Sequence, residues 1–344
     1  NAIILCIPTP LGKNREPNLT FIKETIQFLL PHLNKGKVIS LESTTYPGTT
    51  EEIIKPLIES KGFEIGKDIF LIYSPEREDP GNIEFPLSDI PEVLGGTSKN
   101  CSIIGEVLYK TIVKQIIVVK NTKTAEMTKL IENIHRSVNI GLVNELKPLA
   151  EKMGIDLYEV IEAASTKPFG FSAYYPGPGL GGHCLPIDPF YLTWKAREFG
   201  MNTRFIELAG EINQSMPKYV VQKTIDVLND SFLSVRGSKV LLLGMAYKKN
   251  IDDLRESPSI EIFNLLHEKG AEIEYCDPYL NEIPIMRKKS PRLKSIDLSL
   301  KKLKSFDIVL LLTDHDIFDY EFILENSKII IDTRGRYESK GKIY

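Results

Sequence analysis

The 344 residues predict two or three domains at roughly 150 residues each, and a hydrophobic content of 42% is ample for packed cores. Lysine and arginine number 43 against 46 aspartates and glutamates, and this net charge of −3 gives no general attraction for nucleic acid or an anionic membrane. Four scattered cysteines, no Cys-x-x-Cys pair and no apolar run near roughly 20 residues argue against a disulfide framework, structural zinc and a membrane span. These features favour a reduced, cytoplasmic protein.

The chain opens directly on an apolar run, Ala2–Ile7, which is closed by Pro8 and Pro10. A continuous apolar run predicts a strand buried on both faces, as in a parallel sheet. Such a strand needs neighbours, and connections between parallel strands take a dozen or more residues. We therefore expect the N-terminal strands of the first domain to be missing from this chain.

The rest of the first block alternates helix and strand patterns. A helical pattern lies at 19–33 and another around Ile53–Ile58. The strands that we expect here are Val38–Ser43, Ile69–Tyr73 and Ile116–Val119. Strands that alternate with helices are typical of a doubly wound α/β domain.

The middle block has apolar residues at helical spacing and no strand pattern. One long helix is expected from residue 122 to the region of Gly154, and helical patterns resume from Phe190 to about Leu228. Between them lies the glycine- and proline-rich stretch Pro176–Asp188, which can form neither a helix nor a central strand. Its bare amides suit close approach to an oxygen-rich or phosphorylated ligand.

The last block returns to the α/β pattern. The expected strands are Lys239–Gly244, Glu272–Cys276, Asp307–Thr313 and Lys328–Asp332, with a helix at Ser259–Lys269. The basic stretch Arg287–Lys304 predicts a solvated surface connection rather than a binding site.

The most informative segment is Gly181-Gly-His-Cys184, with Asp188 four residues further on, where the helical pattern begins. A thiol near a helix N-terminus can have a lowered pKa and serve as a nucleophile. The alternative is that Cys184 is a small buried hydrophobic residue. His183 has no partner at metal-ligand spacing, so we expect no metal site.

Packing is our interpretation of the other cysteines, Cys6, Cys101 and Cys276, which lack that glycine-rich context.

The cysteine motif resembles that of the nucleotide-sugar 6-dehydrogenases, which act on UDP-glucose, UDP-N-acetylglucosamine or UDP-N-acetylmannosamine. Further stretches match this family in the same order, and together they cover nearly the whole chain. They are Pro8–Pro10, Glu42–Thr50, Ser74–Arg77, Thr124–Asn133, Gly244–Asn250 and Asp253–Ser257. The chain is therefore identified from its sequence as a member of this family.

The resemblance implies two Rossmann-like doubly wound domains joined by a central, largely helical dimerisation domain. Residues 1–121 would belong to the NAD-binding domain, 122–228 to the central domain with the cysteine loop, and 229–344 to the UDP-binding domain. It also implies a homodimer or larger homo-oligomer that oxidises the sugar C6 alcohol to a carboxylate for surface polysaccharide biosynthesis. The oxidation uses two NAD and one water, and Cys184 captures the C6 aldehyde as a thiohemiacetal that becomes a thioester.

The other implied catalytic residues lie before and after this loop. Lys129 and Asn133 are four residues apart on one helix face, where an ammonium and an amide can stabilise the developing alkoxide. Asp188 and Glu76 are the implied acid/base residues, and Thr44 would hold the hydrolytic water. Without the resemblance, Lys129 is an ordinary solvated lysine and Glu76 an ordinary loop carboxylate.

The resemblance also implies binding residues. Cofactor contacts are implied for Thr9, Thr44 and Arg255, and substrate contacts for Lys129, Asn133, Arg136, Gly181, Lys248 and Arg334. The alternative for Lys248 and Arg255 is that they are surface charges beside Asp252 and Asp253. The family's GxGxxG turn after the first strand and its ribose-binding acidic residue are absent from these residues, which puts the affinity for NAD in doubt.

The segment Asn133-x-x-Arg136 resembles the enzymes that act on N-acetylated sugars, and the loop Pro176–Leu192 resembles the UDP-N-acetylglucosamine branch. Arg136 shares a helix face with Asn133 and offers five donors to an acetamido carbonyl, although an ion pair between domains or subunits is an alternative. We predict UDP-N-acetylglucosamine or its C2 epimer UDP-N-acetylmannosamine as the substrate. The alternatives are a UDP-glucose 6-dehydrogenase, a UDP-sugar-binding fragment without activity, and a two-electron β-hydroxyacid dehydrogenase, which would not need the cysteine.

Overall fold

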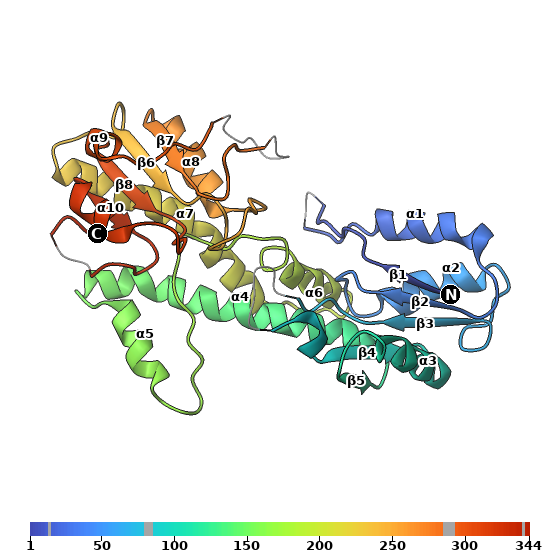
Figure 1. The fold of residues 1–344 in the computed structure, drawn as a ribbon. Coiled ribbons are helices and arrows are strands. Elements are labelled where there is room, and N and C mark those ends of the chain that lie inside the picture. Colours follow the sequence, from blue (N-terminus) through green and yellow to red (C-terminus); the bar gives the residue numbers. More distant parts are fainter. Residues whose placement is uncertain (13–14, 79–84, 285–292, 339–340) are drawn as a thin grey trace. The chain divides into compact units, whose positions relative to one another are not determined.

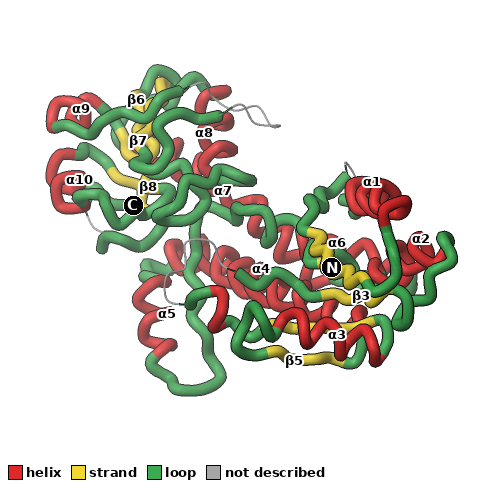
Figure 2. Tube along the Cα trace, turned by 45° about the vertical axis from the view of Figure 1, so that its right-hand side comes forward, coloured by secondary structure: helices red, strands yellow, loops and turns green. Residues whose placement is uncertain are grey.

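The computed structural model describes residues 1–12, 15–78, 85–284, 293–338 and 341–344 and divides into two compact units (Figures 1 and 2). The first unit contains Asn1–Arg136 and Ile187–Glu207, and the second contains Ser137–Pro186 and Leu208–Tyr344. The long helices α4 (Thr122–Lys152) and α7 (Arg204–Asp230) run through the boundary. The expected division into three parts, at 1–121, 122–228 and 229–344, stays a prediction.

The first unit is built on a five-stranded sheet in the order β1-β2-β3-β4-β5. Its strands are β1 (Ala2–Leu5), β2 (Lys37–Leu41), β3 (Ile69–Tyr73), β4 (Glu92–Gly96) and β5 (Ile116–Val119). Its helices are α1 (Thr20–Leu29), η1 (Leu30–His32), η2 (Thr50–Ile54), α2 (Lys55–Glu59), η3 (Leu87–Asp89), α3 (Lys99–Tyr109) and α6 (Asp188–Arg197), together with the first part of α4. All pairings are parallel except β3 with β4. The parallel strands β1, β2 and β3 therefore end at one edge of the sheet, after Leu5, Leu41 and Tyr73.

The expectation for the first strand is wrong in one respect. β1 pairs with β2 only, as an edge strand of the described sheet, and of its four residues only Leu5 is buried, while Ile4 is 40% exposed. An edge strand has one covered side, so a continuous apolar run does not by itself show burial on both faces.

The antiparallel strand β4 has no strand pattern that we recognised in the sequence, because two of its five residues are glycines. Both glycines lie where backbone crosses closely. A Cβ on Gly95 would lie 2.3 Å from the carbonyl oxygen of Asn121, and a Cβ on Gly96 would lie 2.4 Å from the amide of Ser102. Close packing therefore selects glycine here over a residue with high strand propensity.

The second unit contains a four-stranded parallel sheet in the order β7-β6-β8-β9. Its strands are β6 (Lys239–Leu243), β7 (Glu272–Cys276), β8 (Ile308–Leu311) and β9 (Ile330–Asp332), and its helices are α5 (Leu157–Ser165), α8 (Pro258–Glu268), α9 (Leu300–Ser305) and α10 (Tyr320–Asn326) with parts of α4 and α7. Because β7 and β8 flank β6 on opposite sides, the strand order reverses at β6. Ligands of doubly wound sheets bind beyond the carboxyl ends of the strands at such a point.

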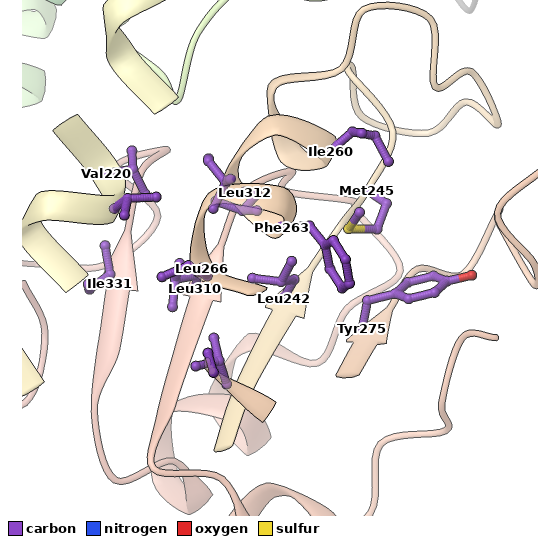
Figure 3. Packing of buried hydrophobic residues seen from close by; sticks show 14 of the residues in the cluster. Val220, Leu242, Met245, Ile260, Phe263, Leu266, Tyr275, Leu310, Leu312 and Ile331 are labelled. Carbon is purple, nitrogen blue, oxygen red and sulfur yellow. The ribbon is translucent and has the colours of Figure 1, made fainter. Parts of the chain in front are cut away.

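The core of this second sheet consists of buried aliphatic and aromatic residues. Phe263 and Leu266 of α8 pack over Leu242 and Leu310 of the neighbouring strands β6 and β8 (Figure 3). Leu242, Leu266 and Leu310 are fully buried. The loops that follow β6 and β8 therefore project from a packed core.

The long central helix is confirmed. α4 spans 31 residues and ends at Lys152, just before Gly154, which has the left-handed φ of 68° that ends helices. Part of the predicted basic connection, at 285–292, lies outside the described residues, and another part forms α9. Within the described residues, no helix has the length and apolar character needed to cross a membrane.

Candidate active site

In the first unit, three polar side chains of α4 are buried on one helix face. Glu126, Lys129 and Asn133 are 0%, 7% and 5% exposed. The Lys129 ammonium donates to the main-chain carbonyl of Glu76, and Nδ2 of Asn133 donates to Oδ2 of Asp188 at 2.6 Å. Lys129 is therefore no solvated surface lysine, and it lies in one cluster with Asn133 and Asp188.

Asp188 is the first residue of α6 and is 1% exposed. Burial raises the pKa of this carboxyl to about 7, against the lowering effects of the Lys129 charge and the Asn133 hydrogen bond. A carboxyl that titrates near neutral pH can both accept and release a proton at working pH.

Glu76 meets this cluster through its backbone. Its carboxylate is exposed, and Oε1 accepts a hydrogen bond from the amide of Glu78. The group that meets Lys129 is the backbone carbonyl. In this structure Glu76 therefore orients the lysine through its main chain.

Glu126 was not singled out in the sequence. Its carboxylate accepts hydrogen bonds from the amide of Gly48 (2.5 Å), the amide of Thr50 (2.9 Å) and the hydroxyl of Thr50 (2.7 Å). It thereby caps the start of η2 from a separate helix, and it attaches the turn after β2, which includes Thr44, to α4. The sequence signal that could have identified Glu126 is its position about one helical turn before Lys129, on the same face of the predicted helix.

The carboxyl edge of β1, β2 and β3 is the edge at which doubly wound sheets bind their ligands. Thr9 is 3% exposed and its hydroxyl donates to the carbonyl of Thr44 at 2.9 Å, while Tyr191 donates to the carbonyl of Thr9. At the same edge the hydroxyls of Thr45 and Tyr73 are buried without a hydrogen-bond partner in the described part of the chain. Orphaned hydroxyls beside two of the expected cofactor contacts fit a polar ligand such as NAD at this edge.

Glu92 of β4 leads to a prediction about stability. It is 8% exposed, it accepts a hydrogen bond from Ser74 at 2.6 Å, and burial raises its pKa from 4.5 to about 7. Between these two values the native state binds more protons than the unfolded state, so this contribution to stability is lost as pH rises. We expect Glu92→Gln to raise the free energy of unfolding by about 1–3 kcal/mol at about pH 8 and to have little effect at about pH 4. Urea denaturation at both pH values measures this, and an equal effect at both would contradict it.

In the second unit, the glycine-rich loop is held by a network of buried polar groups. The amide of Gly177 donates to Oδ1 of Asn144 at 2.9 Å, and Nδ2 of Asn144 donates to Oδ1 of Asn213 at 2.8 Å. The Tyr158 hydroxyl lies 3.2 Å from the carbonyl of Pro176 and 2.9 Å from that of Thr333. The loop is therefore a fixed part of this unit.

Gly181 and Gly182 lie against the loop that follows β6. A Cβ on Gly181 would lie only 2.4 Å from Cβ of Tyr247, and Gly182 has φ of 83°. The Gly182 amide donates to the carbonyl of Arg255 at 2.8 Å. The glycines are thus needed for packing, and two residues further along the chain Cys184 is exposed.

The three cations expected in this unit lie on loops after the strands. Nε of Arg334 donates to the carbonyl of Leu312 at 2.7 Å, beside Gly177. Lys248 is half-buried, whereas Arg255 is exposed and forms an ion pair with Asp253 at 2.6 Å. Its exposure agrees with the alternative that Arg255 is a surface charge beside Asp253, and the cofactor contact implied for Arg255 stays a prediction.

The expected residues thus fall into two groups, one in each unit. The first unit brings together Thr9 with Thr44, and Lys129 with Asn133, Asp188 and the backbone of Glu76. The second unit contains Gly181, Cys184, Lys248, Arg255 and Arg334. Arg136, the last residue of the first segment of the first unit, is exposed, whereas Asn133 is buried. It therefore lies outside the buried stripe of α4.

Three parts of the chain match models of one family, the UDP-glucose/GDP-mannose dehydrogenase family. Residues 1–113 match its NAD binding domain, 123–215 its central domain and 241–339 its UDP binding domain. The first match begins at residue 1, and a solved structure aligns over 99% of the chain.

Relatives with established names agree with these matches. The chain is 35% identical to UDP-N-acetyl-D-mannosamine dehydrogenase of Methanocaldococcus jannaschii, over 97% of this chain and 75% of that protein. It is also 35% identical to UDP-N-acetyl-D-glucosamine 6-dehydrogenase of Pseudomonas aeruginosa, over 82% of this chain and 67% of that protein. The structure of UDP-D-ManNAc dehydrogenase from Pyrococcus horikoshii superposes with a TM-score of 0.88 at 32% identity, over 99% of this chain and 78% of that one. The chain belongs to the UDP-glucose/GDP-mannose dehydrogenase family and is an NAD-dependent UDP-sugar dehydrogenase.

Proposed function

We propose that this enzyme oxidises the C6 alcohol of UDP-N-acetylglucosamine or UDP-N-acetylmannosamine to the carboxylate, with Cys184 as the nucleophile. The observation that carries this proposal is the buried cluster of Lys129, Asn133 and Asp188. An ammonium, an amide and a carboxyl that titrates near neutral pH suit the oxidation of an alcohol. Burying these polar groups is unfavourable for folding, and apolar side chains would pack there at lower cost, so their presence indicates a functional role.

Bound NAD supplies the hydride acceptor for both oxidations. In the first, Asp188 takes the proton of the alcohol while Lys129 and Asn133 donate hydrogen bonds to the C6 oxygen. The Cys184 sulfur then adds to the aldehyde carbon, and the new alkoxide receives a proton. The second oxidation removes a hydride from the carbon of this thiohemiacetal and a proton from its hydroxyl, and a thioester remains. Water held near Thr44 attacks it with Asp188 or Glu76 as base, so that the C–S bond breaks and the thiol is restored.

Chain length supports a joint role for Cys184 and Asp188. Only three residues separate them, so their Cα atoms can be no further apart than about 14 Å, even in a fully extended chain. This short separation is compatible with the proposal that the thiol and the carboxyl act on one substrate.

The choice of substrate rests on Arg136 and on the names of the relatives. Arg136 is exposed, and its guanidinium can donate hydrogen bonds to the carbonyl of an acetamido group. In UDP-glucose a hydroxyl takes the place of this group and does not extend as far. A site built to bind a substrate group discriminates strongly against analogues that lack it. Polysaccharide precursors include such N-acetylated uronic acids, and we propose that role for the product.

A panel of UDP-sugars with NAD tests the proposed function. We expect kcat/KM to be at least about tenfold higher for an N-acetylated sugar than for UDP-glucose, and Arg136→Leu to narrow this ratio. NADH formation at two equivalents per sugar reports the four-electron reaction, and one equivalent would indicate a two-electron dehydrogenase. A higher kcat/KM for UDP-glucose than for both N-acetylated sugars would contradict the substrate assignment.

We further propose that the enzyme is a homodimer. Three residues of α4 in the second unit, Leu142, Leu146 and Leu149, are 52%, 37% and 53% exposed, and Met153, just after the end of this helix, is 63% exposed. Their spacing places them along one helix face. An exposed apolar stripe of this kind suits a second copy of the same helix.

A further inference from the structure

The loop that carries Cys184 packs against the segment Asp253–Ser257 of the same unit. The Gly182 amide donates to the carbonyl of Arg255 at 2.8 Å, and the carbonyl of Glu256 would lie 3.2 Å from a Cβ on Gly181. Glu256 itself has φ of 50°, which residues other than glycine rarely adopt. The backbone of Arg255 is thus hydrogen-bonded to Gly182, which precedes the proposed nucleophile Cys184 by two residues.

The side chain of Arg255 is oriented by Asp253. Nη2 donates to Oδ2 of Asp253 at 2.6 Å, Nε lies 2.9 and 3.1 Å from the two carboxylate oxygens, and the Arg255 amide donates to Oδ1 at 2.8 Å. Asp253 is held in turn because its carbonyl accepts a hydrogen bond from the amide of Tyr247 at 3.0 Å. The guanidinium therefore has a defined position beside the cysteine loop.

The charge of Arg255 reaches this loop. The pKa of His183 is lowered first by burial and then by Arg255. The pKa of Arg255 is raised first by its hydrogen bond to Asp253, and the charge of Cys184 is among the further causes. The charged groups that act on this loop, through His183, are those of Arg255, Glu256 and Asp253.

We propose that Arg255 stabilises the thiolate of Cys184, and that Asp253 limits this effect by neutralising part of the guanidinium charge. A cation beside a thiol favours the thiolate, which is the nucleophilic form. Arg255 is then a positioning residue for the nucleophile, in addition to any contact with the cofactor. This inference rests on the proposed role of Cys184, but its test does not depend on turnover.

The test is the rate of alkylation of Cys184 by iodoacetamide as a function of pH, in the full chain without NAD or sugar. Mass spectrometry of the peptide that contains Cys184 separates it from the exposed Cys6. We expect Arg255→Met to raise the pH midpoint and to slow the reaction about threefold below it, which corresponds to about half a pKa unit. We expect Asp253→Asn to lower the midpoint and to accelerate the reaction by a similar factor.

Two further variants serve as controls. Arg255→Lys keeps the charge and should keep most of the wild-type midpoint. Lys249→Met removes an exposed cation of the same unit that pairs with Asp316 at 3.2 Å, and it should leave the midpoint unchanged.

An unchanged midpoint in Arg255→Met, or a change in the plateau rate alone, would overturn the inference, because the plateau reports access to the thiol and not its charge. A shift in the same direction in Arg255→Met and Asp253→Asn would also overturn it. Failure of the proposed function is recognised separately, by uronate formation in Cys184→Ala.

Discussion

We expect Cys184→Ala to abolish formation of the UDP-uronic acid and to lower kcat by a factor of at least about 10³, because a covalent nucleophile is lost. Without the thiol no thioester forms, so the second oxidation has no covalent substrate. Cys184→Ser slows turnover drastically, because a serine hydroxyl at its ordinary pKa is a much weaker nucleophile. The measurement is the amount of uronate and of NADH formed per enzyme from the preferred UDP-sugar.

Cys6→Ala is the matched control for this result. Cys6 is the other exposed cysteine, and burial first, then its hydrogen bond to Glu42, raise the pKa of its thiol to about 11. That thiol is inert near neutral pH, so its removal leaves uronate formation at the wild-type level. Uronate production by Cys184→Ala at the wild-type rate would rule out the assignment of the nucleophile.

Asp188→Asn lowers kcat by a factor of about 10²–10⁴, the usual effect of losing a general acid/base. The exchange preserves the shape of the side chain, and the amide oxygen can still accept the hydrogen bond from Asn133. Circular dichroism and thermal unfolding therefore stay close to those of the unaltered enzyme. A loss of fold together with activity would instead assign Asp188 a structural role.

The pH profile separates these roles further. Because burial raises the pKa of Asp188 to about 7, the ionised base accumulates as pH rises through that value, and kcat/KM rises with it. Asp188→Asn removes this step from the profile. Glu92→Gln removes another carboxyl with a pKa raised to about 7, yet it keeps the step. A step that persists in Asp188→Asn would show that another group acts as the base.

Local pattern was sufficient for much of the fold. The apolar runs of β2, β3 and β5 to β9 and the long helix α4 were each expected close to their observed positions. β4 and α3 were not recognised. β4 contains two glycines that allow close packing against Asn121 and Ser102. A sequence pattern of a few neighbouring residues cannot predict such contacts.

The candidate site shows a similar division. Resemblance in the sequence selected Lys129 and Asn133, but local pattern could not tell a buried lysine from a solvated one. Their partners, Glu76 and Asp188, are 53 and 55 residues away in the chain. Glu126 was missed for the same reason, since the amides that it caps lie 76 and 78 residues away.

The sequence by itself determined the family, the α/β character of both sheets and the glycine-rich loop that carries Cys184, because these depend on residue types at short spacing. Only the tertiary structure decided that β1 is an edge strand of the described sheet and that the carbonyl of Glu76, not its carboxylate, meets Lys129. It also decided the pKa of Asp188, which shifts to about 7 through burial. Burial and hydrogen bonding are set by neighbours that are distant in the chain, and these neighbours meet only when the sheets and helices pack.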